Sequence, residues 1–203
     1  MEATFSLKSA LNCINTSLID LDEQKIGFES PYGSVVDSSL RCLAGFGRFT
    51  ILSERLLSSY KTIDGRGQKI KLTGKGLRLK ECEHVIICNL LIQGGVGDDA
   101  DAIQIKPNSK HIWIDRCSLS DFCDGLIDIS RQRTDITISR CHFANHNKTI
   151  LIGADASHAG DRRFTIVSLM GRGRDIRFGK VHLYNNYTRN WAIYAVCTSV
   201  EAK

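Results

Sequence analysis

Apolar and polar residues alternate along the central part of this chain, and the alternating runs return at a fixed spacing. The runs 100–105, 124–129 and 148–153 follow one another in steps of 24 residues, and the Ile-x-Ile runs 112–114 and 136–138 repeat this step. Alternation with a period of two indicates β-strands. A fixed period of about 20–50 residues is typical of stacked structural repeats. We therefore expect each repeat to form one coil of a stack.

The short strands favour an all-β fold, a right-handed single-stranded parallel β-helix. A hairpin meander would need two-residue turns between the runs, and these are not evident. Inward-facing Ile, Leu and Val would fill the core, and the alternate outward positions are available for chemistry. We assign residues 51–203 to the β-helix domain. Residues 1–50 form a separate N-terminal segment in this interpretation, partly helical or irregular, with a short helix at 10–19.

Composition and charge narrow the functional classes. The 203 residues are 42% hydrophobic and 24% charged, as expected for a folded globular domain. No run approaches the ~18 apolar residues of a membrane span, and the first residues do not read as a secretory signal peptide. A net charge of +5 makes a polyanion a reasonable partner. There is no arginine-rich run of the kind that indicates nucleic-acid binding.

Eight cysteines raise the question of zinc or disulfides, but no CxxC pair is present. Cys117 and Cys141 differ by one repeat, so we expect them to lie in one column of neighbouring coils. Their spacing would permit a disulfide. We favour free buried thiols, because a parallel stack points both side chains in the same direction.

Five motifs in order, at 64–67, 112–115, 124–128, 148–153 and 177–186, resemble a plant-type pectate lyase of polysaccharide lyase family 1. The resemblance runs from about Tyr60 to the C-terminus. Relative to the family, a long segment between Phe49 and Ser58 is nearly absent and the chain stops earlier. The resemblance therefore implies a shortened, truncated member of this family, with a poorly defined N-terminal segment.

The resemblance implies a Ca²⁺-dependent lyase that cleaves α-1,4-polygalacturonate, or pectate, by β-elimination. It implies pectin polysaccharide as the partner and a monomer that acts outside the cell, in the cell wall, although no signal peptide is visible. Two alternatives stay open. One is a catalytically impaired, pectin-binding remnant of the same family, and the other is a β-helical hydrolase of the polygalacturonase type.

Four aspartates form the predicted metal site. Asp99 and Asp101 precede one strand, while Asp124 and Asp128 bracket the equivalent strand one repeat later, and the resemblance places the calcium ligands at these positions. Calcium binds about six to eight oxygen atoms, so clustered carboxylates suit it. Ordinary solvated turn aspartates are the alternative. We expect Asp115 to have a structural role.

The resemblance assigns the remaining site roles to three basic residues. Lys148 stands one repeat after Asp124 and is expected to bind the substrate carboxylate, or to form an ion pair with Asp124. Arg172 is the implied catalytic base, and Arg177, five positions later, is the second arginine of the pair and binds substrate. The link 173–176 lacks the proline of the family, and the stretch 165–171 is shorter than in relatives, so the alignment of Arg172 stays open.

Overall fold

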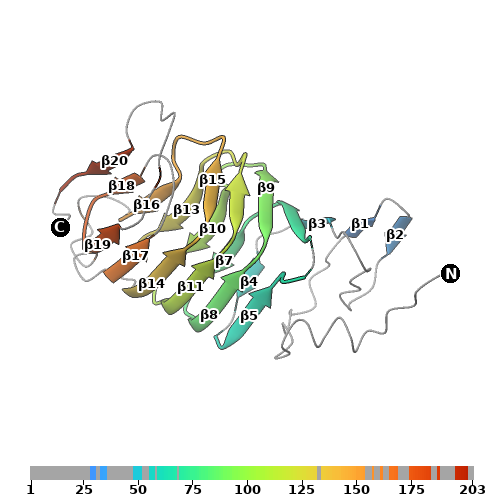
Figure 1. The fold of residues 1–203 in the computed structure, drawn as a ribbon, viewed down its shortest axis with the longest axis horizontal. Coiled ribbons are helices and arrows are strands. Elements are labelled where there is room, and N and C mark those ends of the chain that lie inside the picture. The colour runs from blue at the N-terminus through green and yellow to red at the C-terminus, as the bar shows by residue number, and fades with distance from the viewer. Residues whose placement is uncertain are drawn as a thin grey trace.

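The computed structural model describes residues 28–30, 33–35, 48–51, 55–57, 59–67, 69–131, 134–153, 157, 161, 165–168, 174–183, 187 and 195–200. Short β-strands follow one another along these residues (Figure 1). Their bounds are β1 Phe28–Ser30, β2 Gly33–Val35, β3 Arg48–Ile51, β4 Arg55–Leu57, β5 Lys61–Asp64, β6 Lys71–Gly74, β7 Leu77–Leu79, β8 Glu83–Cys88, β9 Leu91–Gly95, β10 Asp101–Ile105, β11 Lys110–Asp115, β12 Ser118–Ser120, β13 Gly125–Ile129, β14 Thr134–Ser139, β15 His142–Ala144, β16 Ile150–Ile152, β17 Thr165–Ser168, β18 Arg174–Ile176, β19 Lys180–Leu183 and β20 Val196–Thr198.

The strands wind into coils whose sides are parallel sheets, which confirms the predicted β-helix (Figure 1). A seven-stranded sheet has the order β20-β18-β16-β13-β10-β7-β4. A six-stranded sheet runs β19-β17-β14-β11-β8-β5, and a five-stranded sheet runs β15-β12-β9-β6-β3. Neighbouring strands of each sheet come from successive coils, and residues far apart in sequence therefore lie side by side.

The 24-residue step holds for the first pair of repeats and fails for the second. Asp101 pairs with Gly125, as the step predicts, but Ile127 pairs with Ile150, which is 23 residues away. Ser120 pairs with Ala144, and the chain then takes seven residues to reach Ile127 but only six to reach its partner Ile150. The alignment of 148–153 with 124–129 by a step of 24 was therefore wrong by one residue. Corner length, which alternation does not control, sets the register.

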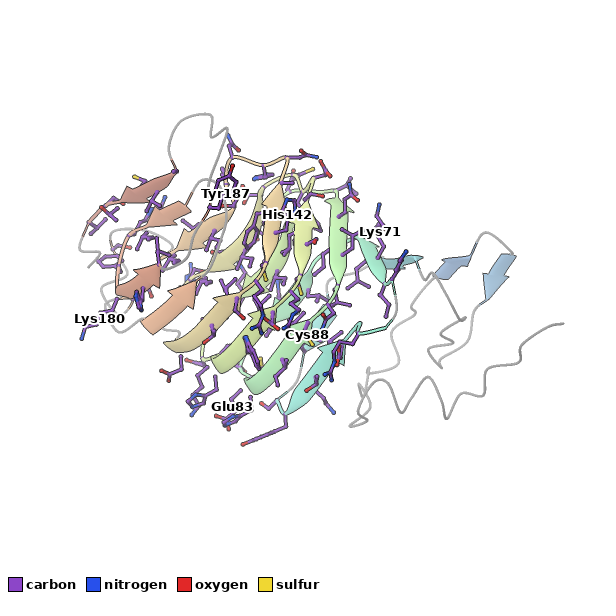
Figure 2. All side chains as sticks on the ribbon, viewed as in Figure 1. Lys71, Glu83, Cys88, His142, Lys180 and Tyr187 are labelled. Atoms are coloured by element: carbon purple, nitrogen blue, oxygen red, sulfur yellow. The ribbon has the colours of Figure 1, made fainter. Side chains whose placement is uncertain are left out.

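Columns of isoleucine and leucine fill the interior of the coil. Ile103, Ile127 and Ile150 lie in one column of the seven-stranded sheet and are all buried. Burying a side chain of this size contributes about 1.5–3 kcal/mol, so the stacked column supplies much of the stability of the coil. Figure 2 shows the side chains on the ribbon, with the exposed Lys180 projecting at the margin of the molecule.

Cys117 and Cys141 are buried free thiols in neighbouring coils, as expected. The Cys117 thiol donates a weak hydrogen bond to the carbonyl of Ile87, and Cys141 donates one to the carbonyl of Ile114. These thiols occupy small interior positions and bond to the backbone of the coil, so their role is packing.

Asp115 also has the structural role predicted for it. It ends β11 and is almost fully buried. Its carboxylate accepts hydrogen bonds from Ser139 Oγ at 2.6 Å and from Arg140 Nε and Nη2 at 2.8 and 2.7 Å. Arg116 Nη1 donates a further bond at 2.8 Å. Asp115 therefore ties the coil of β11 to the coil of β14.

In the N-terminal part, β1 and β2 pair antiparallel, and β3 pairs with β6 in parallel. The short helix predicted at 10–19 lies outside the described residues. The division of the chain at residue 50 stays a prediction. No helix formed by the described residues is long and apolar enough to cross a membrane.

Candidate active site and metal centre

The outer face of the seven-stranded sheet is hollowed into a cleft of about 600 Å³. Its floor comes from β10, β13 and β16, whose side chains alternate between the core and this face. The lining combines acidic and basic residues, and most of the predicted site residues belong to it: Asp99, Asp101, Lys106, Pro107, Asp124, Gly125, Ile127, Asp128, Ser130, Arg131, Lys148, Ile150, Leu151 and Arg177.

Three of the four predicted acids converge within the cleft. Asp99 lies in the corner before β10 with a positive φ of 53°, Asp101 begins β10, and Asp124 directly precedes β13. The Asp124 amide donates to the carbonyl of Ala100 at 3.1 Å, which joins the two coils at this point. One carboxylate oxygen from each of the three acids lies within 4.8 Å of the others. This spacing allows the three acids to share one cation.

Gly125 makes room for the carboxylate of Asp101. The two residues are partners in register, and a Cβ atom at position 125 would lie only 2.4 Å from Asp101 Oδ1. Any other residue would force the carboxylate to move. In the sequence, Gly125 stands out only as part of a motif, and this function was missed.

Gln104 fixes the orientation of Asp101 from the other side. Its buried amide nitrogen donates to Asp101 Oδ2 at 2.9 Å and to the carbonyl of Asp99 at 2.8 Å. Its carbonyl oxygen accepts from Arg78 Nε at 2.8 Å. An arginine can only donate, so Arg78 determines which end of the amide faces the acids. A polar residue between Ile103 and Ile105 is the sequence signal that could have indicated this role, and Gln104 was not predicted as a site residue.

Burial raises the pKa of Asp101 to about 6, against the opposing hydrogen bond from Gln104. The negative charges of Asp128, Asp124 and Asp99 add to this rise. The cluster therefore holds mutually repelling carboxylates in a partly desolvated place. A positive ion is the partner that would relieve this repulsion.

Asp128, the fourth predicted acid, lines the same cleft but lies outside the three-acid group. Its Oδ2 accepts from Lys106 Nζ at 3.0 Å and more weakly from Ser130 Oγ at 3.4 Å. Its Oδ1 is buried and has no hydrogen-bond partner in the described part of the chain. A buried acceptor without a partner is costly, so the carboxylate of Asp128 is only partly satisfied within the described part of the chain.

The basic residues predicted for substrate binding line the cleft as well. Lys148 Nζ contacts Asp124 Oδ1 at 2.6 Å, although the register sets the backbone of Lys148 beside Gly125 and not beside Asp124. Arg177 is half-buried, and its Nη1 donates to the carbonyl of Gly153 at 3.2 Å. Arg172, the predicted base, lies outside the described residues.

The donor set fits a hard divalent cation. Carboxylate oxygens are the ligands that Ca²⁺ prefers, and three of them stand within one group. Gly125 leaves the space that Asp101 needs, and the partnerless Asp128 Oδ1 adds an acceptor in the same cleft. These observations support Asp99, Asp101 and Asp124 as the first candidates for ligands, with Asp128 next to them.

The sequence profile of the family described as pectate lyase matches residues 32–203, which is most of the chain. This chain belongs to the pectate lyase family. The predicted family membership is thereby confirmed, and the β-helix described above is the fold on which this family member carries its cleft.

Curated pectate lyases resemble the chain over about seven tenths of its length. "Probable pectate lyase 4" of Arabidopsis thaliana is 40% identical over 157 residues, 71% of this chain and 42% of the relative. "Probable pectate lyase P56" of Solanum lycopersicum is 38% identical over 177 residues, 73% of this chain and 44% of the relative. The chain thus spans less than half the length of these relatives.

A solved structure supports the fold assignment. Jun a 1, the major allergen from cedar pollen, superposes with a TM-score of 0.73 at 32% identity, covering 78% of this chain and 54% of the allergen. A thermostable pectate lyase, PL 47, superposes with a TM-score of 0.60 at 28% identity, covering 73% of this chain and 46% of the lyase. Both comparisons leave a large part of the solved proteins unmatched.

Proposed function

We propose that this chain acts as a Ca²⁺-dependent pectate lyase that cleaves α-1,4-polygalacturonate by β-elimination. The observation that carries the proposal is the meeting of Asp99, Asp101 and Asp124 with Lys148 in one cleft on the outer face of a β-helix. Membership of the pectate lyase family supports the reaction class.

The acids hold the cation in this proposal. Asp99, Asp101 and Asp124 supply carboxylate oxygens, and Asp128 supplies a further acceptor. Bound calcium would neutralise a uronate carboxylate and so make the proton on C5 more acidic. Gln104 and Gly125 keep the Asp101 carboxylate in place between the two coils.

The basic residues bind and orient the polymer. Lys148, whose side chain is 64% exposed, can leave Asp124 for a substrate carboxylate, because an exposed ion pair is worth only about 0–1 kcal/mol. Arg177 lines the same cleft and offers further donors to a uronate group. Arg172 is the proposed base that removes the C5 proton, a role that requires its neutral form to be favoured by burial and nearby cations.

Pectin polysaccharide in the cell wall is the proposed partner, met outside the cell by a monomer. A cleft lined by lysine and arginine side chains suits a polyanion of repeating carboxylates.

A lyase assay tests the proposal. The chain is incubated with polygalacturonate and calcium, and unsaturated oligosaccharides are detected by their ultraviolet absorbance. Product that appears with calcium and disappears with a chelator supports a lyase. Arg172→Ala should abolish it, whereas the control Lys80→Ala, which removes an exposed lysine paired with Glu81, should not.

Other outcomes point to the alternatives. Reducing ends without unsaturation would indicate a hydrolase. Salt-sensitive polymer binding without any product would indicate a catalytically impaired, pectin-binding member of the family. Either result would overturn the lyase proposal.

A further inference from the structure

Lys106 and Asp128 form the most shielded ion pair of the cleft among the described residues. Lys106 Nζ lies 3.0 Å from Asp128 Oδ2, and the two side chains are only 20% and 12% exposed. The pair of Lys148 with Asp124, in the same cleft, is 64% and 41% exposed. Water screens a charge at the surface far more than one that is buried. The electrostatic effect of Lys106 on the cleft is therefore less screened by water than that of Lys148.

Asp128 is held in place by this lysine but is not satisfied by it. Both contacts of its carboxylate, from Lys106 and Ser130, go to Oδ2. Oδ1 is buried, belongs to a residue that lines the cleft, and has no partner among the described atoms. Asp128 therefore has one oxygen without a partner and one that is occupied by an ammonium group, so that removing this ammonium group would free Oδ2 for a ligand.

The same pattern gives three of the four acids a positive neighbour. Arg78 Nη2 lies 3.9 Å from Asp99 Oδ2. Lys148 contacts Asp124, and Lys106 contacts Asp128. Asp101 receives the neutral amide of Gln104 instead. Of these three cations, Lys106 forms the ion pair that is best shielded from water, so its charge bears most directly on a divalent ion in the cleft.

We propose that Lys106 sets the affinity of the cleft for its divalent cation, by neutralising Asp128 and by occupying one of its two oxygens. This inference rests on the cation site of the proposed function. Calcium affinity in proteins varies over orders of magnitude with the number of charged ligands. Loss of the ammonium therefore tightens binding, because a cation repels a cation and because Asp128 gains a free oxygen.

Calorimetric titration of the full chain with calcium chloride measures this effect without any need for catalysis. Lys106→Met keeps the aliphatic stem and removes the charge, and we expect the Kd for calcium to fall about tenfold. Lys106→Arg keeps the charge and should leave the Kd close to that of the unmodified chain. Lys110→Met is the matched control, because Lys110 forms a 2.9 Å pair with Glu83 on another sheet. Its Kd should not change. Glu83 is the first residue of β8 and lies at the lower margin of the molecule in Figure 2.

A double variant identifies the route of the effect. In Lys106→Met/Asp128→Asn the gain in affinity should disappear, because the carboxylate that was released is no longer present. Lys106→Gln, which is neutral but still able to donate to Asp128, serves as the second variant should Lys106→Met fail to fold. It should also bind calcium more tightly.

The outcomes separate this inference from the proposed function. Unchanged or weaker calcium binding in both neutral variants, with normal binding by the unmodified chain, overturns the role of Lys106 and leaves the metal centre standing. An absence of calcium binding in the unmodified chain and in every variant overturns both. Tighter binding by the neutral variants supports Lys106 even if the lyase assay yields no product.

Discussion

Asp101 and Asp115 are both buried aspartates on neighbouring sheets of one coil, and their surroundings are opposite. Asp101 is 6% exposed and Asp115 is 3% exposed. Asp115 faces two arginines and a serine hydroxyl, whereas Asp101 faces a neutral amide and three further carboxylates.

The two pKa values move in opposite directions as a result. Burial raises the pKa of both groups. At Asp115 the hydrogen bonds from Arg140 and Ser139 and the charges of the arginines outweigh burial, so its pKa lies below the ordinary value. At Asp101 nothing outweighs burial, and the pKa rises to about 6. The carboxylate of Asp115 is neutralised by arginines of the protein, whereas the carboxylate of Asp101 is suited to bind a cation from solution.

The largest predicted effect on stability comes from removing the carboxylate of Asp115. Asp115→Ala leaves two arginines and Ser139 without their acceptor, and breaking such a buried pair costs about 3–5 kcal/mol of unfolding free energy. The lowered pKa of Asp115 means that its carboxylate stabilises the fold at pH values above the ordinary pKa of aspartate. This contribution is lost as the pH falls through the lowered pKa. Urea unfolding at neutral pH measures the cost.

The control for this prediction is Arg116→Met, which removes one exposed partner of the same acid. It should cost no more than about 1 kcal/mol. Equal losses for the two variants would show that Asp115 does not hold the coils together.

At Asp101 we expect the opposite pH dependence of the unfolding free energy. Since its folded pKa of about 6 lies above the ordinary value, this group favours the fold most at low pH, and that contribution is lost as pH rises toward and through 6. Asp101→Asn keeps the acceptor for Gln104 and removes the charge. In chelator at pH 8 it should stabilise the fold by about 2 kcal/mol, seen as a higher Tm.

The control at the exposed neighbour, Asp98→Asn, should leave the Tm unchanged at both low and high pH. A Tm for Asp101→Asn below that of the unmodified chain at pH 8 would mean that Asp101 is satisfied after all. Asp101 and Asp115 would then not differ in the way proposed.

Filling the space beside Asp101 should weaken the site. In Gly125→Ala the new Cβ would lie 2.4 Å from Asp101 Oδ1, so the carboxylate must rotate away, at a cost of about 1–2 kcal/mol. Calcium affinity should fall about tenfold, as for other misplaced ligands. Calorimetry and urea unfolding measure both.

Gly94→Ala is the matched control for this change. Gly94 has a φ of +79° with no atom within 4 Å of a Cβ at that position. The substitution should therefore strain the backbone by about 1–2 kcal/mol without altering calcium affinity. A similar affinity loss at both glycines would contradict a specific role for Gly125.

The smallest predicted effect removes the amide that orients Asp101. Gln104→Leu deletes a buried donor and should cost about 1 kcal/mol of stability and about tenfold in calcium affinity. Gln93→Leu deletes a comparable 2.7 Å bond, from Gln93 to Asp121 on the five-stranded sheet side of the coil. It should lower stability slightly and leave calcium affinity as it is, and any larger effect on affinity would remove the distinction between the two amides.

The sequence by itself determined the β-helix and the approximate location of the site. Alternating Ile-x-Ile runs and the 24-residue step are local properties of the chain, and parallel stacking follows from them. Asp99, Asp101 and Asp124 could be predicted as neighbours because each stands at or near the start of a strand in adjacent coils. The five motifs, in their order along the chain, were sufficient to indicate the family.

Only the tertiary structure decided how the acids are partnered. The 23-residue step to β16 depends on the length of one corner, and hydrophobic alternation does not determine that length. The roles of Lys106, Arg78 and Gly125 arise between coils, from residues more than 20 positions apart. Gln104 binds Asp101 within its own coil, but it is oriented by Arg78 of the preceding coil. Charge and burial act through distance in space, so the same residue type became a structural tie at position 115 and a candidate ligand at position 101.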